Sequence, residues 1–265
     1  METEKKALLV VSFGTSYTEA IENCIHPVEK AAAQVAEGFD LYRAFTSNMV
    51  IRKLKDTQGL VVWTPGQALE ELTLRGYQEI AVQPTHILAG VEYHELKQEV
   101  MDFQSRHAEI RILLGQPLLF ENKDYVAAAK ALGHWMPETG EHEVVLLMGH
   151  GTEHVSNSSY FELQYYLDRL PTKAVYVANV EAPPVLEDVM QKFKEEKIQK
   201  IYLMPFMLVA GDHAHNDMTG ASENSWSNRL QKQGFTIEVL MKGLGESSDF
   251  CRLYAEKTAL MLRNE

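Results

Sequence analysis

The chain has 265 residues, of which 45% are hydrophobic and 23% are charged, a composition typical of a globular protein that buries a core. Its 25 Lys and Arg residues are outnumbered by 37 Asp and Glu residues, which gives a formal net charge of −12. This acidic balance argues against a protein whose main partner is nucleic acid or an anionic lipid surface, so an anionic ligand must bind at a local basic patch.

The apolar stretches of the sequence are too short for a transmembrane helix. The longest, residues 201–211, contains a proline and falls short of the roughly 18 residues that a membrane span needs. Two lysines precede an apolar run at residues 7–11, but that run is too short for a secretory signal. Cys24 and Cys251 form no CxxC pair, which favours free thiols in a reducing compartment. We therefore expect a cytoplasmic protein with no membrane partner.

Short apolar and β-branched runs alternate along the chain with segments of helical periodicity. The predicted strands cover residues 7–11, 40–45, 80–83, 110–115, 144–148, 174–180, 201–207 and 235–240. The predicted helices cover residues 19–37, 64–75, 92–106, 124–135, 159–170, 184–196, 222–233 and 249–263. Alternation of this kind indicates an α/β protein whose parallel sheets are covered by helices on both faces.

The second half of the chain resembles the first. Residues 8–15 (LLVVSFGT) match residues 146–152 (LLMGHGT) in character and position. Residues 80–92 and 201–213 form a second matching pair, in which the spacing from Pro to Gly is identical. Pro, Gly and charged residues interrupt the periodicity at residues 137–142.

This repeat predicts two α/β lobes of similar design, with residues 1–137 forming the N-terminal lobe and residues 138–265 the C-terminal lobe. The pairing aligns Phe13 with His150, each after the first strand of its lobe. The lobes are therefore expected to share a scaffold, while the C-terminal lobe carries the histidines.

Three side chains that could bind a metal follow predicted strands of the C-terminal lobe. They are His150, Glu181 and His213, of which His213 corresponds to Glu92 in the first lobe. Because ligands of parallel sheets bind at the carboxyl ends of the strands, two imidazoles and a carboxylate would converge at one edge. That set suits Fe²⁺, Co²⁺, Ni²⁺ or Zn²⁺, and the glycines beside the histidines leave room for a bulky ligand. A structural role remains the alternative for each histidine, and Glu181 is equally suited to cap the helix that follows.

The remaining motifs predict no cofactor. Residues 12–16 (SFGTS) resemble a phosphate-binding loop, but the sequence has neither GxGxxG nor GxxxxGKS/T, so no nucleotide site is predicted. Arg52, Lys53 and Lys55 form the densest basic cluster, and with Arg43 they could hold substrate carboxylates. A solvated helix face is the more common role for such a run.

Several motifs occur together in a characteristic order. They are ALLVVSFGTS at residues 7–16, RAFTS at 43–47, IRKL at 51–54, GHGT at 149–152 and VAGDHA at 209–214. In these motifs the chain resembles the class II chelatases, and among them the sirohydrochlorin cobaltochelatases of the anaerobic cobalamin pathway. The resemblance extends over nearly the whole chain. It implies a two-lobed α/β fold with the tetrapyrrole held in a cleft between the lobes.

The resemblance also implies roles for particular residues. His150 and His213 would face the metal, Glu181 would complete its site, and Glu92 matches a first-lobe glutamate placed across the cleft. Family members typically have Gly after the metal-site glutamate, where this chain has Ala182. Imidazoles suit both metal delivery and removal of the pyrrole protons, and Glu92 would take or relay the second proton.

We expect Phe13, Thr15 and Arg52 to bind the tetrapyrrole, with Arg43 and Lys53 as further partners for its carboxylates. The predicted reaction is ATP-independent insertion of Co²⁺ into sirohydrochlorin, with the divalent metal as a substrate and no prosthetic group. The resemblance also suggests a homo-oligomer.

Other functions remain open from the sequence. Fe²⁺ and Ni²⁺ fit the same ligands, so siroheme synthesis is an alternative to cobalamin synthesis. A carrier could bind the tetrapyrrole or the metal without inserting it. A metallohydrolase or non-haem iron enzyme could use the same two imidazoles and carboxylate. Position along the chain leaves open which histidine accepts the first proton.

Overall fold

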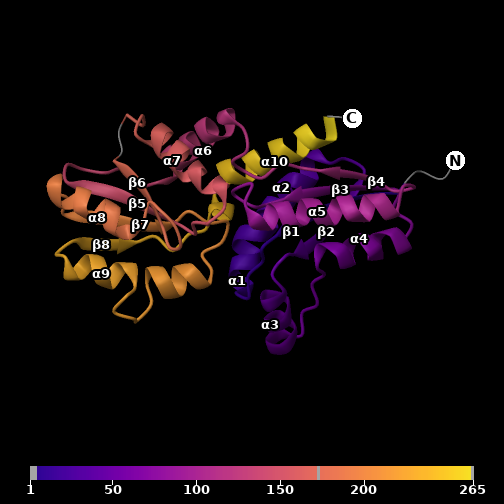
Figure 1. The fold of residues 1–265 in the computed structure, drawn as a ribbon, viewed down its shortest axis with the longest axis horizontal. Coiled ribbons are helices and arrows are strands. Elements are labelled where there is room, and N and C mark those ends of the chain that lie inside the picture. Colours follow the sequence, from indigo (N-terminus) through magenta and orange to yellow (C-terminus); the bar gives the residue numbers. More distant parts are fainter. Residues whose placement is uncertain (1–4, 172–173, 264–265) are drawn as a thin grey trace. The chain divides into compact units, whose positions relative to one another are not determined.

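The computed structural model describes residues 5–171 and 174–263. Within these residues the strands form two four-stranded parallel sheets, in the orders β2-β1-β3-β4 and β6-β5-β7-β8 (Figure 1). The strands are β1 Lys6–Ser12, β2 Phe39–Phe45, β3 Glu79–Pro84, β4 Arg111–Leu114, β5 Glu143–Gly149, β6 Val175–Asn179, β7 Lys200–Pro205 and β8 Thr236–Val239. The shared strand order confirms the predicted pair of similar α/β lobes, each a parallel sheet flanked by helices.

Helices connect the strands in both sheets. The longer ones are α2 His26–Val35, α3 Asn48–Gln58, α4 Pro65–Leu74, α5 Val91–Arg106, α6 Asn122–Trp135, α7 Ser158–Leu167, α8 Leu186–Glu195, α9 Trp226–Lys232 and α10 Ser248–Arg263. The short ones are α1 Thr18–Ala20, the π-helices η1 Ile21–Ile25 and η3 Ala214–Met218, and the 3₁₀ turns η2 Val155–Asn157 and η4 Leu244–Glu246. Among the described residues, none of the helices combines the length and the apolarity that crossing a bilayer requires.

The sequence analysis missed α3. Ser47 begins this helix by accepting a hydrogen bond from the Val50 backbone N–H at 3.3 Å, and Gly59 ends it with a left-handed φ of 68°. Its outer face is mostly charged, and Val50 and Leu54 are its buried residues. The short apolar stripe explains why periodicity alone did not predict a helix here.

The first sheet is buried on both faces. Along β1, Ala7, Leu9 and Val11 pack with apolar residues of α4 and α5. Leu8 and Val10 point to the opposite face and pack with residues of α2 and α10. Burial on both faces explains why this strand is a continuous apolar run rather than an alternating one.

The second sheet has the same layered design. Val144, Leu146 and Met148 of β5 share a cluster with Phe193 of α8 and Trp226 of α9. Val145 and Leu147 alternate with these residues along the strand and therefore point to the opposite face. Helices α6 and α7 lie together on one side of this sheet (Figure 1). The packing of these apolar residues thus holds β5 in place, and the Gly-His-Gly motif begins at the end of this strand.

The predicted boundary at 137/138 needs correction, because the two compact units are residues 1–120 with 248–265, and residues 121–247. Helix α6 belongs to the second unit, where it packs against α7. Helix α10 belongs to the first unit and packs along α2. The fully buried Tyr254 of α10 donates a hydrogen bond to the Thr85 carbonyl at 2.8 Å, which anchors the helix beyond β3. The predicted cleft between the lobes stays a prediction.

His86 lies just beyond β3, and its imidazole is buried without a partner. Both ring nitrogens are inaccessible to solvent and have no hydrogen bond among the described residues. Burial lowers the pKa of His86 from 6.5 to about 4, and the negative charge of Glu92 opposes this shift. The imidazole is therefore neutral in the folded protein near neutral pH.

This burial makes the stability of the protein depend on pH. Between pH 6.5 and about 4 the unfolded chain binds a proton at His86 that the folded chain excludes. About 3 kcal/mol of unfolding free energy is therefore present above pH 6.5 and is lost as the pH falls through this window. We expect His86→Phe to flatten the slope of unfolding free energy against pH, measured by urea denaturation. His26→Leu, at an exposed histidine, serves as control, and an unchanged slope in His86→Phe would contradict this expectation.

Candidate metal centre

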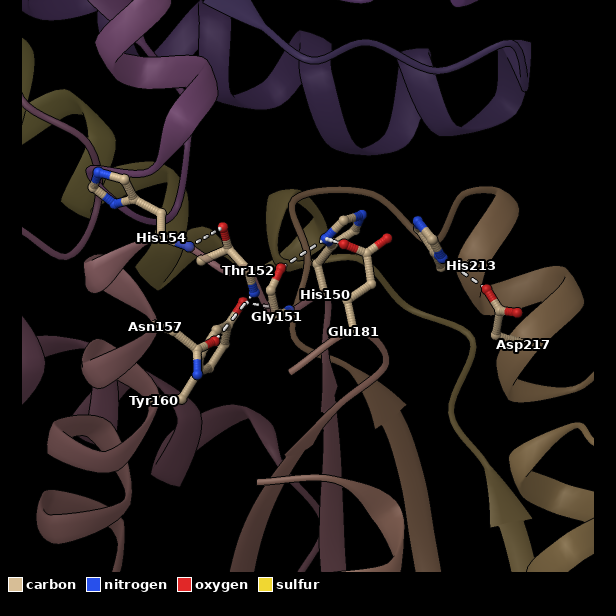
Figure 2. A network of polar contacts seen from close by, with 9 residues as sticks. All are labelled: His150, Gly151, Thr152, His154, Asn157, Tyr160, Glu181, His213 and Asp217. Carbon is tan, nitrogen blue, oxygen red and sulfur yellow. Dashed lines mark hydrogen bonds and ion pairs between the residues drawn. The ribbon is translucent and has the colours of Figure 1, made fainter. Parts of the chain in front are cut away.

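The three residues predicted to bind a metal follow neighbouring strands. β5 lies between β6 and β7 in the sheet, so the carboxyl ends of the three strands are adjacent. His150 comes directly after β5, Glu181 follows β6, and His213 lies beyond β7 just ahead of η3. Figure 2 shows the three side chains gathered at this edge. The adjacency that the sequence analysis assumed for these strands is therefore confirmed.

The two imidazoles lie in contact. Their ring centroids are 4.5 Å apart and the rings are nearly perpendicular, at 89°. Nδ1 of His150 lies 2.9 Å from the Gly151 carbonyl oxygen and 3.5 Å from Oε2 of Glu181. Because a carbonyl oxygen can only accept, Nδ1 of neutral His150 carries the proton and its lone pair is on Nε2.

Asp217 favours the same tautomer for His213, with the proton on Nδ1. Nδ1 of His213 donates to Oδ2 of Asp217 at 2.7 Å, which leaves the Nε2 lone pair for a ligand (Figure 2). Carboxylates behind a metal-binding imidazole commonly fix its tautomer and ring orientation. The sequence analysis missed Asp217, although its i, i+4 spacing from His213 is the signal that could have identified it.

Glu181 points toward Nδ1 of His150. Its side chain is about half exposed, and no group of three His, Cys, Asp or Glu side chains is arranged to hold a metal ion in the described part of the chain. Glu181 would have to turn away from Nδ1 to join the two Nε2 atoms around one ion. The three-ligand set stays a prediction, with the two histidines already facing each other.

The glycines beside His150 allow neighbouring parts of the chain to approach closely. Gly151 has a φ of +80°, and a Cβ atom there would lie 2.8 Å from the Ala182 backbone nitrogen. A Cβ on Gly149 would lie 2.2 Å from Oδ1 of Asn179. These contacts let the Glu181 backbone N–H donate to the His150 carbonyl at 2.9 Å. The expectation that glycines leave room for a bulky ligand was wrong at these two positions, because Asn179 and Tyr160 fill the space at Gly149 and the backbone after β6 fills it at Gly151.

The first unit holds the other predicted site residues near the ends of its strands. Phe13 directly follows β1 and is 49% exposed, whereas Thr15 is buried and its hydroxyl accepts a hydrogen bond from the Tyr17 backbone N–H at 3.2 Å. Glu92 is exposed in the first turn of α5. The side chains of Phe13 and Glu92 are thus accessible, while the Thr15 hydroxyl supports a turn, and the predicted roles of all three residues stay predictions.

The basic residues fall into two groups. Arg43 donates two hydrogen bonds of 2.6 Å to the buried carboxylate of Glu29, and these bonds raise the pKa of its guanidinium. Arg43 therefore neutralises Glu29, and its predicted role as a substrate partner is not supported. Arg52 and Lys53 are exposed on α3, where Nζ of Lys53 lies 5.7 Å from the centre of the Tyr17 ring.

Comparison with protein families identifies the chain. The family model described as cobalt chelatase (CbiK) matches residues 6–261. The chain belongs to this cobalt chelatase family. A sirohydrochlorin cobaltochelatase of Salmonella typhimurium strain LT2 is 41% identical over 245 residues, covering 92% of this chain and 91% of the relative. The sirohydrochlorin cobaltochelatase CbiKC of Nitratidesulfovibrio vulgaris strain Hildenborough is 27% identical over 257 residues, covering 95% and 89%.

Solved structures of other chelatases share the fold. SirB from Bacillus subtilis with Fe³⁺ matches at a TM-score of 0.67 and 18% identity, with 98% of each chain covered. The cobalt complex of the sirohydrochlorin chelatase SirB from B. subtilis subspecies spizizenii matches at a TM-score of 0.64 and 17% identity, covering 98% of this chain and 96% of the other. The two-lobed chelatase fold is therefore common to these proteins.

The close approach at Gly151 predicts a specific loss of stability in this chelatase. Gly38 has a similar φ of +83°, but a Cβ atom there would meet nothing within 4 Å. Gly38→Ala therefore reports backbone strain alone, and Gly151→Ala adds a steric clash with Ala182 and Asn179. We expect Gly151→Ala to lower the unfolding free energy by about 1–3 kcal/mol more than Gly38→Ala, measured by chemical denaturation. Equal losses in the two variants would show that the segments after β5 and β6 are not tightly packed.

Proposed function

We propose that this protein inserts Co²⁺ into sirohydrochlorin without nucleotide hydrolysis. The observation that carries the proposal is the contact between His150 and His213, each with an Nε2 lone pair that no described residue engages, in a member of the cobalt chelatase family. The names of the Salmonella and Nitratidesulfovibrio relatives specify both the substrate and the metal. These names favour cobalt over the siroheme alternative.

The reaction sets three chemical demands. Free-base tetrapyrrole and Co²⁺ give the cobalt complex and two protons, so water must leave the ion and two pyrrole N–H groups must lose their protons. The macrocycle must also bend so that its nitrogen lone pairs point at the ion. Binding energy from the rest of the substrate can drive this distortion toward the transition state.

The two imidazoles meet the first demand. Co²⁺ is a borderline ion that binds imidazole nitrogen well, so the Nε2 atoms of His150 and His213 would replace two of its waters. The Gly151 carbonyl and the Asp217 carboxylate hold the rings from behind. Glu181, once turned from Nδ1 of His150, would add negative charge that favours a dication.

Proton removal follows from the transfer of the metal. When Co²⁺ moves to the pyrrole nitrogens, the Nε2 atoms are released and become bases that can accept a pyrrole proton. Glu92, exposed in the first turn of α5, is the proposed acceptor or relay for the second proton.

Substrate binding is assigned to α3 and to Phe13. Arg52, Lys53 and Lys55 are exposed on α3, and none of them forms an ion pair with a carboxylate among the described residues. In a chain with a net charge of −12, this helix is a suitable partner for the peripheral carboxylates of sirohydrochlorin. The exposed ring of Phe13 offers an apolar surface for the macrocycle.

We further propose that the protein acts in the cytoplasm, as a homo-oligomer, with no prosthetic group. Cys24 and Cys251 are both buried, and neither is part of a disulfide within the described residues, which fits a reducing compartment.

The proposal is tested by the anaerobic absorbance change of sirohydrochlorin with Co²⁺ and, separately, with Fe²⁺. We expect rapid conversion by the wild type and a loss of at least about 100-fold in His150→Ala and His213→Ala, since each removes a metal ligand that is also a base. Fluorescence titration should show that both variants still bind sirohydrochlorin. His107→Ala, at a histidine paired with Glu109 away from the strand ends, serves as control.

A carrier would give a different result. It would shift the spectrum of bound sirohydrochlorin but would not accelerate metal insertion over the protein-free reaction. That outcome would overturn the chelatase proposal. Faster insertion of Fe²⁺ than of Co²⁺ would instead restore the siroheme alternative.

A further inference from the structure

Two loops carry the proposed ligands of the second sheet. The loop after β5 contains His150, and the loop after β6 contains Glu181. Backbone hydrogen bonds join the loops where they leave the strands, from Val180 N–H to the Gly149 carbonyl at 3.1 Å and from Glu181 N–H to the His150 carbonyl at 2.9 Å. Among the described residues, no backbone hydrogen bond joins the two loops beyond these two.

Asn157 joins the same loops further out. It ends the 3₁₀ turn η2 directly before α7. Its Oδ1 accepts a hydrogen bond from the Thr152 backbone N–H at 3.1 Å, as Figure 2 shows. Its Nδ2 donates to the Pro183 carbonyl oxygen at 2.6 Å. The Asn157 carboxamide therefore links Thr152, two residues after His150, to Pro183, two residues after Glu181.

We propose that Asn157 is a positioning residue that sets the separation of His150 and Glu181 and thereby the affinity for Co²⁺. The inference rests on the proposed function, because it concerns the ligands assigned there. The Asn157 side chain touches neither ligand directly. Its effect on cobalt is transmitted by the two loop backbones, whose positions it couples.

The chemistry requires a carboxamide at this position. An aspartate would have nearly the same shape and could still accept from the Thr152 N–H, but its carboxylate has no proton to donate to the Pro183 carbonyl. Asn157→Asp therefore removes one hydrogen bond and sets two acceptors against each other, with little change in volume. Asn157→Ala removes both bonds without adding charge and provides a second variant.

The chain offers a matched control at Gln164 on α7. Its Nε2 donates to the Val175 carbonyl at 2.7 Å, and its Oε1 accepts from the Val177 N–H at 2.8 Å. This carboxamide makes the same kind of bridge in the same unit, but at the start of β6 rather than beyond its carboxyl end. Nε2 of Gln164 also donates to Oδ1 of Asp168 at 2.7 Å, so Gln164→Glu loses the bond to the Val175 carbonyl and a second bond to a carboxylate. It does so without touching the loops that carry the proposed ligands.

The test is calorimetric titration of the full chain with Co²⁺ alone, followed by steady-state kinetics with sirohydrochlorin. We expect Asn157→Asp and Asn157→Ala to raise the Kd and the KM for Co²⁺ at least about 10-fold, as is usual when support for a metal ligand is lost. The Kd for sirohydrochlorin should not change. Gln164→Glu should keep the wild-type Kd for Co²⁺, even where its thermal stability falls as much as that of Asn157→Asp.

Other outcomes separate this inference from the proposed function. An unchanged Kd for Co²⁺ in both Asn157 variants, with an active wild type, would overturn the inference and leave the proposed function intact. Equal loss of Co²⁺ affinity in Gln164→Glu would also overturn it, by showing a general effect of stability. If the wild type neither bound nor inserted Co²⁺, the proposed function would fail and the inference with it.

Discussion

The parallel pairing of β5 with β6 on one side and β7 on the other is the constraint on which the candidate site depends. Parallel strands place their carboxyl ends at one edge, so three loops far apart in sequence meet there. The burial of residues 144–149 of β5, on both faces of the sheet, holds this edge in register. His150 and His213 are in contact because of this pairing, although they lie far apart in the chain.

Contacts in the loops then determine how the two histidine rings are oriented at this edge. Glycine at position 151 allows the segment after β6 to approach the segment after β5, which a side chain would prevent. The Gly151 carbonyl accepts a hydrogen bond from Nδ1 of His150, and the Asp217 carboxylate accepts one from Nδ1 of His213. The result is a pair of rings whose Nε2 lone pairs are unengaged within the part of the chain that the structure describes. This arrangement suits an ion that must be held and then released.

The sequence predicted the strands and the placement of the histidines well, because both follow from strong and local patterns. Continuous apolar runs are typical of strands buried on both faces, and a residue that ends such a strand must lie at the sheet edge. That α10 belongs to the first unit could not be predicted in this way. The hydrogen bond from Tyr254 to the Thr85 carbonyl, which anchors this helix, joins residues 169 positions apart in the sequence. Arg43 was misjudged for a related reason, since its partner Glu29 is buried on another element. His86 gave no signal, because the absence of a partner is visible in three dimensions alone.

The central claim is that two imidazoles at the edge of the second sheet hold the cobalt ion. Co K-edge X-ray absorption of the cobalt-loaded protein, recorded without tetrapyrrole, tests it most directly. We predict the scattering pattern of two imidazole ligands in the wild type and of one in His213→Ala. A shell of oxygen ligands without imidazole scattering in the wild type would contradict the claim.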